Sequence, residues 1–193
     1  MSFKKEFYII RHGETDWNKL GLVNGITDRP LTKKGINQAE ITRDKIFSKI
    51  KELNFKTIVH SPLSRAKDTA SIINQKLNLP MIEVLELREA SVGELEGKPH
   101  PSHETWQKWI NGEFIGNGVE SFEDGKKRVK IGLQKALEYE NPLIVAHGGV
   151  FFQMCSILNI QNNDILFENC VLYHIRNTNT NFPTIRQVFN DDL

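Results

Sequence analysis

Short runs of apolar residues alternate with longer amphipathic segments along most of this chain. A short continuous apolar run is typical of a strand that is covered on both faces, as the strands of a parallel sheet are. Such runs predict four strands, at residues 7–10, 57–59, 81–85 and 143–146. Near the end of the chain two more runs, at 171–175 and 184–189, are separated by Asn and Thr residues, which favours a hairpin.

Apolar residues spaced three or four positions apart predict helices between these strands. Thr32 is the expected N-cap of a long helix that ends near Leu53. Most of the apolar stripe of this helix is expected to consist of Ile36, Ala39, Ile46, Phe47 and Ile50. Three further helices are predicted, the first opened by residues 61–64 and ending near Leu77, the others at 122–137 and 150–158.

Strands and helices that alternate in this way build a mostly parallel sheet with right-handed crossovers. The expected fold class is α/β, a three-layer α/β/α sandwich with a mostly parallel central sheet and an antiparallel edge. Residues 93–117 interrupt the alternation with four glycines, two prolines and a short helix that carries Trp106 and Trp109. Because the alternation resumes afterwards, we interpret 93–121 as a cap-like excursion from a single domain that spans residues 1–193.

The charge balance limits the partners that are expected. The chain has 193 residues, of which 25 are basic and 24 are acidic. A chain so close to neutral gives no sequence-wide electrostatic reason to bind nucleic acid or an anionic membrane. Any site for an anion must therefore be built locally, from a few residues that the fold brings together.

The sequence does not favour a location in a membrane or in an oxidising compartment. The residues after Met1 offer only a short apolar run before Arg11, which does not resemble a signal peptide. No apolar stretch approaches the roughly 20 residues that a membrane span needs. Cys155 and Cys170 fit neither a disulfide framework nor a metal-ligand spacing, so we interpret them as buried free thiols. These features favour a cytoplasmic protein.

Charged and imidazole side chains occur where each of the four predicted parallel strands ends. Ligands gather beyond the carboxyl ends of the strands in sheets of this kind, so the placement points to a functional site. An unrelated surface scatter would also put some of these residues at the amino ends of strands. In chain order the residues are Arg11, His12 and Asn18, then His60, Ser61 and Arg65, then Arg88 and Glu89, and then His147, Gly148 and Gly149.

These residue types suit the transfer of a phosphoryl group. Such a group carries close to two negative charges, which the guanidinium groups of Arg11 and Arg65 can bind bidentately. His12 could act as a nucleophile near neutral pH, because imidazole is largely deprotonated there. Glu89 is a candidate proton donor to the leaving oxygen. If the arginines neutralise the charge of the transition state, no metal and no cofactor is required, and we expect neither.

The segments that carry these residues resemble the signature of the histidine phosphatase superfamily, the phosphoglycerate-mutase-like proteins. The resemblance runs in the same order over roughly residues 7–150, and it implies a phosphoglycerate-mutase-like fold. The matching segments are Arg11-His12-Gly13-Glu14-Thr15 with Trp17-Asn18, residues 28–32, residues 61–66 with Thr69-Ala70, Leu87-Arg88-Glu89 followed by 93–97, Glu120-Ser121 with Arg128, and residues 145–149.

The resemblance also implies roles for individual residues. His12 would be the phosphorylated nucleophile and Glu89 the general acid and base. Arg11, Arg65 and His147 would form the phosphate clamp. The substrate-binding residues would be Asn18, Asn24 and Gly148, with a small phosphorylated metabolite as the partner. Asn24 stands where the family often shows a small hydroxyl residue or Gln, and Val119 replaces a Gly that usually precedes Glu120-Ser121.

Four functions fit this pattern to different degrees. A phosphomonoesterase of the phosphatase branch fits best. A phosphoglycerate mutase fits less well, because mutases of this family are longer and typically carry Arg directly after the catalytic Glu, where this chain has Ala90. A phospho-ligand binding module without turnover would not need both His12 and Glu89. Protein phosphohistidine phosphatases are often shorter and lack a segment like 93–117.

Several other residues could have a functional role, but a structural role explains most of them equally well. His60 is expected to line the pocket or to pack, and His174 to lie in the core or at an edge. His100, His103 and Glu104 have an HxxH spacing but no evident third ligand, so a metal site is not favoured. The excursion that carries Lys98, His100, Trp106 and Trp109 is expected to roof the pocket and select the leaving group. The substrate and the oligomeric state stay open.

Overall fold

A computed structural model describes residues 6–160, 167–176 and 183–189 of the chain. Its centre is a six-stranded sheet in the order β3-β2-β4-β1-β5-β6. Four neighbouring strands are parallel: β3 (Met81–Glu83), β2 (Thr57–His60), β4 (Pro142–Ala146) and β1 (Phe7–Arg11). β5 (Leu172–Arg176) pairs antiparallel with β1, and β6 (Thr184–Gln187) pairs antiparallel with β5. The mostly parallel sheet with an antiparallel edge is confirmed, and the connection between β5 and β6 lies outside the described residues.

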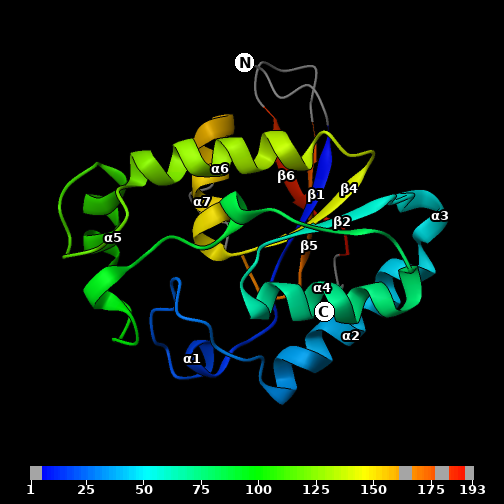
Figure 1. Ribbon diagram of the computed structural model, residues 1–193, viewed down its shortest axis with the longest axis horizontal. Helices are drawn as coiled ribbons and strands as arrows, with labels where there is room; N and C mark the ends of the chain where they lie inside the picture. The colour runs from blue at the N-terminus through cyan, green and yellow to red at the C-terminus, as the bar shows by residue number, and fades with distance from the viewer. Residues whose placement is uncertain (1–5, 161–166, 177–182, 190–193) are drawn as a thin grey trace.

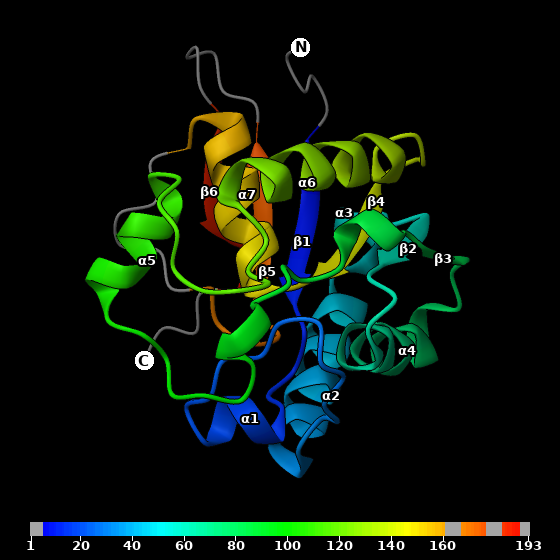
Figure 2. The ribbon, with the colours of Figure 1, turned by 60° about the vertical axis from the view of Figure 1, so that its left-hand side comes forward.

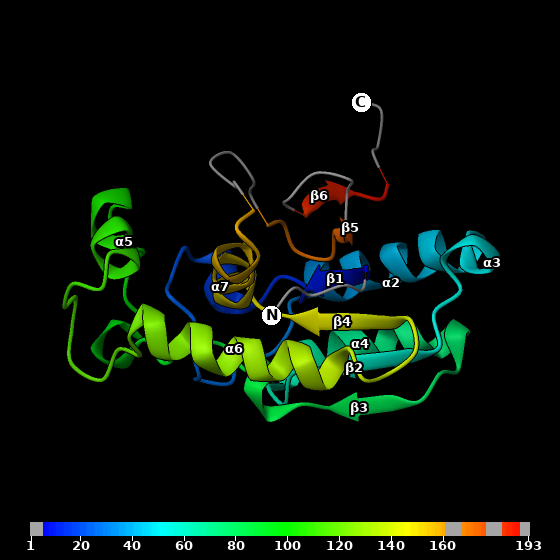
Figure 3. The ribbon, with the colours of Figure 1, turned by 90° about the horizontal axis from the view of Figure 1, so that it is seen from above.

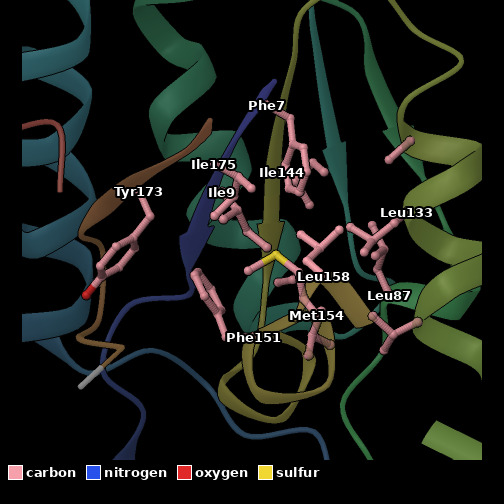
Figure 4. Close-up of a cluster of buried hydrophobic side chains, with 14 of the residues drawn as sticks. Phe7, Ile9, Leu87, Leu133, Ile144, Phe151, Met154, Leu158, Tyr173 and Ile175 are labelled. Carbon is pink, nitrogen blue, oxygen red and sulfur yellow. The ribbon is translucent and has the colours of Figure 1, made fainter. Parts of the chain in front are cut away.

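Helices cover both faces of the sheet (Figure 1). On one face α6 (Phe122–Ala136) and α7 (Gly148–Leu158) pack on Phe7 and Ile9 of β1, in a core that includes Leu133 and Met154 (Figure 4). On the other face α2 (Lys33–Ser48) and α4 (Ser64–Leu77) pack on Tyr8 and Ile10. Alternate residues of a strand point to opposite faces, so β1 contributes to both cores. The structure is the predicted three-layer sandwich.

The long helix after Thr32 differs from the prediction in its end and in its buried face. The Thr32 hydroxyl caps α2 as expected, accepting a hydrogen bond from the Gly35 amide at 3.0 Å. The helix stops at Ser48, and a short helix α3 (Ile50–Leu53) follows. The buried stripe of α2 consists of Gly35, Ala39, Thr42 and Ile46, whereas Ile36 is 42% exposed and Phe47 47% exposed. The apolar stripe was therefore predicted correctly at Ala39 and Ile46 but not at Ile36 or Phe47.

The third strand is shorter than predicted. β3 ends at Glu83, and a 3-10 helix η1 (Leu85–Leu87) carries the chain onward. β3 lies at the edge of the sheet and pairs only with β2, through residues 58–60. Since no other described strand pairs with β3, it ends where pairing with β2 ends. The turn of η1 then brings Arg88 and Glu89 towards the ends of the other parallel strands.

Residues 93–121 depart from the sandwich. They contain a 3-10 helix η2 (Gly93–Leu95) and the helix α5 (His103–Ile110), which stands apart from the sheet near one end of α6 (Figures 2 and 3). Trp109 packs there against Ala90 and Phe122 in a third, small apolar cluster. The predicted short helix is confirmed. The remaining helix, α1 (Asp16–Lys19), lies in the loop after β1.

The two cysteines and the lengths of the helices also bear on the sequence-based expectations. The thiols of Cys155 and Cys170 are both buried, as predicted, and burial raises the pKa of Cys170 to about 12. Among the described residues, no helix has the length and apolar character needed to cross a membrane.

Candidate active site

The carboxyl ends of the parallel strands bring together side chains that are far apart in the sequence. His12 directly follows β1, Ser61 follows β2 and His147 follows β4, while Arg65 lies in the first turn of α4. The register pairs Arg11 of β1 with Ala146 of β4, and His60 of β2 with Val145 of β4. The strands β1, β2 and β4 therefore end at one level of the sheet. This common level is why the residues after the strands can face one space.

His12 is buried and its ring is held by two contacts. Nδ1 lies 2.8 Å from the Gly13 carbonyl oxygen, which can only accept, so Nδ1 carries the proton. Nε2 is then the unprotonated nitrogen, and it accepts a hydrogen bond from Arg65 Nε at 3.3 Å. Burial, followed by the charges of Arg65 and Arg11, holds the pKa of His12 well below its ordinary value. The ring is therefore neutral, with its lone pair directed at a guanidinium.

Arg65 is fully buried and is fixed by the loop after α1. Its Nη1 donates to the Thr27 carbonyl at 3.1 Å and its Nη2 donates to the Gly25 carbonyl at 2.6 Å. Burial lowers its pKa, although the charge of Glu89 acts in the opposite direction. A guanidinium remains charged under these conditions, so Arg65 is a fixed cation beside His12 Nε2.

Arg11 lies at the end of β1 and is only partly used by the protein. Its Nη1 donates to the Phe167 carbonyl at 2.9 Å. Its Nε is buried and has no hydrogen-bond partner among the described residues. Burial lowers the pKa of Arg11, with the charge of Glu89 opposing that effect. A buried donor without an acceptor is costly, so Arg11 Nε is suited to an acceptor that a ligand supplies.

His147 is fully buried at the N-cap of α7, with its ring 5.1 Å from the ring of His12. Its Nε2 lies 2.7 Å from Ser61 Oγ, whereas its buried Nδ1 has no partner in the described part of the chain. Burial, together with the charges of Arg65, His12 and Arg11, lowers its pKa well below the ordinary value. Like Arg11, this neutral imidazole presents an unused polar atom.

Glu89 stands at the N-terminus of α7. One carboxylate oxygen accepts from the Gly149 amide and the other from the Ala90 amide, both at 2.9 Å. The helix N-terminus favours a negative group at this place. Gly149 is needed there, since an added Cβ would lie 2.3 Å from Glu89 Oε1.

Of the predicted substrate-binding residues, Asn18 and Asn24 both contact Thr15 in the loop after β1, and Gly148 lies next to Arg11. Asn18 belongs to a capping box of α1, where its Oδ1 accepts from the Thr15 amide at 3.2 Å. Asn24 donates to Thr15 Oγ1 at 3.2 Å, and its buried Oδ1 has no partner among the described residues. Gly148 lies beside Arg11, where a Cβ would be 3.7 Å from the guanidinium carbon.

The structure gives contacts for two supporting residues to which the sequence assigned no role, although Ser61 was among the predicted strand-end residues. Ser61 contacts His147 as described above, and Thr69 Oγ1 accepts from the Gly13 amide at 3.0 Å next to His12. Both stand in the segments that carry the family resemblance. Their position at the end of β2 and on α4 was a usable signal, but the side-chain contacts depend on the tertiary fold.

The remaining histidines differ in their relation to the central group: burial, followed by the charge of Arg11, lowers the pKa of His100, so the cap reaches the neighbourhood of Arg11. His60 is buried, and its Nδ1 contacts the Ser61 carbonyl at 2.8 Å. His103 contacts Gln107, and His100 lies with its ring 6.3 Å from that of Trp106. Within the described ranges, no three His, Cys, Asp or Glu side chains gather as a metal site would require. His174 stacks on Tyr8 and pairs with Glu6 at 3.1 Å.

Comparison with known proteins identifies the family of the chain. Residues 7–190 match the model of the histidine phosphatase superfamily (branch 1). The chain is 39% identical over 143 residues to "Uncharacterized phosphatase PhoE" of Bacillus subtilis (strain 168), a match that covers 72% of this chain and 70% of that protein. It is 34% identical over 154 residues to "Probable phosphoglycerate mutase GpmB" of Yersinia pestis (strain Pestoides F), covering 74% and 69%.

Solved structures show the same fold. The alpha-ribazole phosphatase from Shigella flexneri is similar with a TM-score of 0.73 and 27% identity, covering 95% of both chains. The phosphoserine phosphatase from Entamoeba histolytica, solved in complex with 3-phosphoglyceric acid, gives a TM-score of 0.75 and 25% identity, covering 96% of this chain and 98% of that one. The chain belongs to the histidine phosphatase superfamily, branch 1.

Proposed function

We propose that this protein hydrolyses phosphomonoesters of small metabolites through a phosphohistidine intermediate on His12. The observation that carries the proposal is the state of His12: a buried, neutral imidazole whose unprotonated Nε2 faces the Arg65 guanidinium at 3.3 Å. A nucleophile beside a fixed cation is what an attack on a phosphate dianion requires.

The proposed reaction has two halves. The Nε2 lone pair of His12 attacks phosphorus, the P–O ester bond breaks, and Glu89 gives a proton to the leaving oxygen. Water then attacks the phosphohistidine and gives a proton to Glu89, while the N–P bond breaks and its electrons return to Nε2. Arg11, Arg65 and His147 bind the phosphoryl oxygens in both halves. The unpartnered Arg11 Nε and His147 Nδ1 support these roles.

The other predicted residues have secondary parts in this proposal. Asn18, Asn24 and Gly148 border the phosphate, and residues 93–121 form a cap over the site within a single histidine-phosphatase-like domain. Because the cationic clamp neutralises the charge, we expect turnover to need no metal ion, and EDTA should leave the rate unchanged.

The test is release of phosphate from para-nitrophenyl phosphate and from a panel of phosphorylated metabolites between pH 5 and 8. His12→Ala should lose the activity, and the wild-type protein quenched during turnover should carry an acid-labile, base-stable phosphate on His12. Equal activity of wild type and variant would exclude the proposed nucleophile.

Phosphoglycerate mutase activity is the second candidate, supported by the similarity to the protein named GpmB. A mutase must return the phosphoryl group to the substrate and keep water away from the phosphohistidine. Incubation with 3-phosphoglycerate, with and without bisphosphoglycerate, separates the two functions. Rapid isomerisation without release of phosphate would replace hydrolysis by the mutase reaction.

A further inference from the structure

A nearly enclosed ion pair, Arg128 with Glu120, lies against the backbone next to Glu89. It joins parts of the chain that are distant in sequence. Arg128 on α6 donates from Nε to Glu120 Oε1 at 2.8 Å and from Nη2 to Glu120 Oε2 at 2.5 Å. The two side chains are 9% and 12% exposed. Two parallel hydrogen bonds of this kind fix the orientation of a guanidinium as well as its position.

The same guanidinium holds the backbone that leads into Glu89. Arg128 Nη1 donates to the carbonyl oxygens of Glu86 at 2.9 Å and Arg88 at 2.6 Å. These carbonyls belong to the turn of η1 and to the residue immediately before Glu89. Glu120 orients Arg128, and Arg128 in turn fixes the point from which the Glu89 side chain projects.

The backbone of Glu120 extends this support to the other side of Glu89 and to the cap. Its amide donates to the Ser91 carbonyl at 2.8 Å, and its carbonyl accepts from Trp109 Nε1 at 2.8 Å. Segments on both sides of Glu89, and the helix α5, therefore meet at one ion pair. Neither Arg128 nor Glu120 is among the residues of the phosphate clamp.

We propose that Arg128 and Glu120 are positioning residues for proton transfer by Glu89. The inference rests on the proposed phosphatase function and adds residues that act through Glu89 without touching the substrate. A proton donor contributes most when the leaving group is a poor one, because an alkoxide must be protonated as the P–O bond breaks. A dinitrophenolate leaves without a proton. Displacement of Glu89 should therefore slow alkyl esters selectively.

The experiment compares kcat/KM for an alkyl phosphate, such as glycerol phosphate, and for 2,4-dinitrophenyl phosphate in wild type and Arg128→Lys. The parameter kcat/KM covers only the steps up to departure of the leaving group, so slow hydrolysis of the phosphohistidine cannot mask the effect. The lysine substitution keeps the charge but not the fork. We expect a loss of about 10-fold or more for the alkyl ester and little change for the dinitrophenyl ester.

Two variants complete the design. Lys135→Met is the matched control, since Lys135 contacts the Glu86 carboxylate at 2.6 Å but none of the carbonyls near Glu89, and it should leave both substrates unchanged. Glu89→Gln should show the same selectivity for leaving group more strongly. If Arg128→Lys does not fold by circular dichroism, Glu120→Gln, which keeps the side-chain shape, makes the same test.

The outcomes distinguish this inference from the proposed function. An equal loss with both esters, or no loss with either, would overturn the positioning role. No hydrolysis of either ester by the wild-type protein would instead overturn the phosphatase function. Selective loss of the alkyl ester supports both.

Discussion

At the scale of single residues, the site consists of neutral imidazoles among fixed guanidinium groups. Burial lowers the pKa of both His12 and His147, and the charges of Arg65 and Arg11 lower it further. Both rings are therefore neutral near pH 7, and the hydrogen bonds to Gly13 and Ser61 determine which nitrogen of each ring faces the site. In the proposed reaction, one residue type would thus supply both the nucleophile, His12, and a phosphate ligand, His147.

Gly149 offers a test of the position of Glu89 at this scale. In Gly149→Ala the new Cβ would lie 2.3 Å from Glu89 Oε1, so the carboxylate must move away from the α7 N-terminus. Because general acid catalysis is worth about 100-fold or more, we expect kcat/KM for alkyl phosphates to fall by a factor of that order. Steady-state kinetics with glycerol phosphate and 2,4-dinitrophenyl phosphate measures the loss.

The neighbouring glycine is the control for this substitution. In Gly148→Ala the Cβ would make an ordinary contact, 3.7 Å from the Arg11 guanidinium, and would not reach Glu89. Phosphate affinity can change in this variant, but the preference between the two esters should remain that of wild type. The same shift of preference in both variants would show that the helix start, and not the Glu89 carboxylate, is responsible.

At the scale of elements, α6 and α7 meet at a buried polar side chain. Gln153 on α7 is fully buried, and neither atom of its amide has a partner among the described residues. It lies against Gly125 on α6, where an added Cβ would be only 1.9 Å from Gln153 Nε2. Gly125 thus makes room for an amide that gains no visible hydrogen bond, which lowers the stability of this helix pair.

Gln153→Met should stabilise the protein, because it keeps the volume of the side chain and removes the unpaired amide. The expected gain in the free energy of unfolding is about 1 kcal/mol, measured by urea denaturation. Gln153→Ala should instead lower stability, since it leaves a cavity. If the methionine variant loses stability, the amide must form hydrogen bonds in solution, for example to a buried water.

The sequence predicted most elements because their patterns are local. Apolar runs identified the strands of the parallel sheet, and Thr32 marked the start of α2 as an N-cap. The buried face of α2 was harder to predict from the sequence. Whether Ile36 or Gly35 is buried depends on how closely α2 approaches the loop at Glu14. The end of β3 likewise depends on its edge position, which no local pattern records.

At the scale of the whole molecule, the sheet order explains why the convergence of these side chains could be predicted from the sequence. Parallel strands in the order β2-β4-β1 end at one level, so the residues that follow them must meet. His12, Arg65 and His147 could be predicted to converge on that ground. The contacts of Arg128 could not, because the four hydrogen bonds of its guanidinium join α6 to η1 and to loops whose course depends on packing.

The burial of the two site imidazoles also has a consequence for the stability of the whole fold. An unfolded chain protonates histidine below about pH 6.5, whereas the folded protein keeps His12 and His147 neutral, so the unfolded state binds more protons as the pH falls. The free energy of unfolding should therefore decrease from pH 7.5 to 5.5, by about 1 kcal/mol for each of the two residues. Urea denaturation in buffers without phosphate measures this slope.

Replacement of the buried imidazole should remove its share of the pH dependence. His147→Asn should show a shallower slope than wild type between pH 7.5 and 5.5, since asparagine takes up no proton in either state. His103→Asn is the matched control, because His103 is exposed on α5 and folding removes little water from its ring. If His147→Asn keeps the wild-type slope, the imidazole must be protonated in the folded protein. His147 would then bind phosphate as a cation and not as a neutral donor.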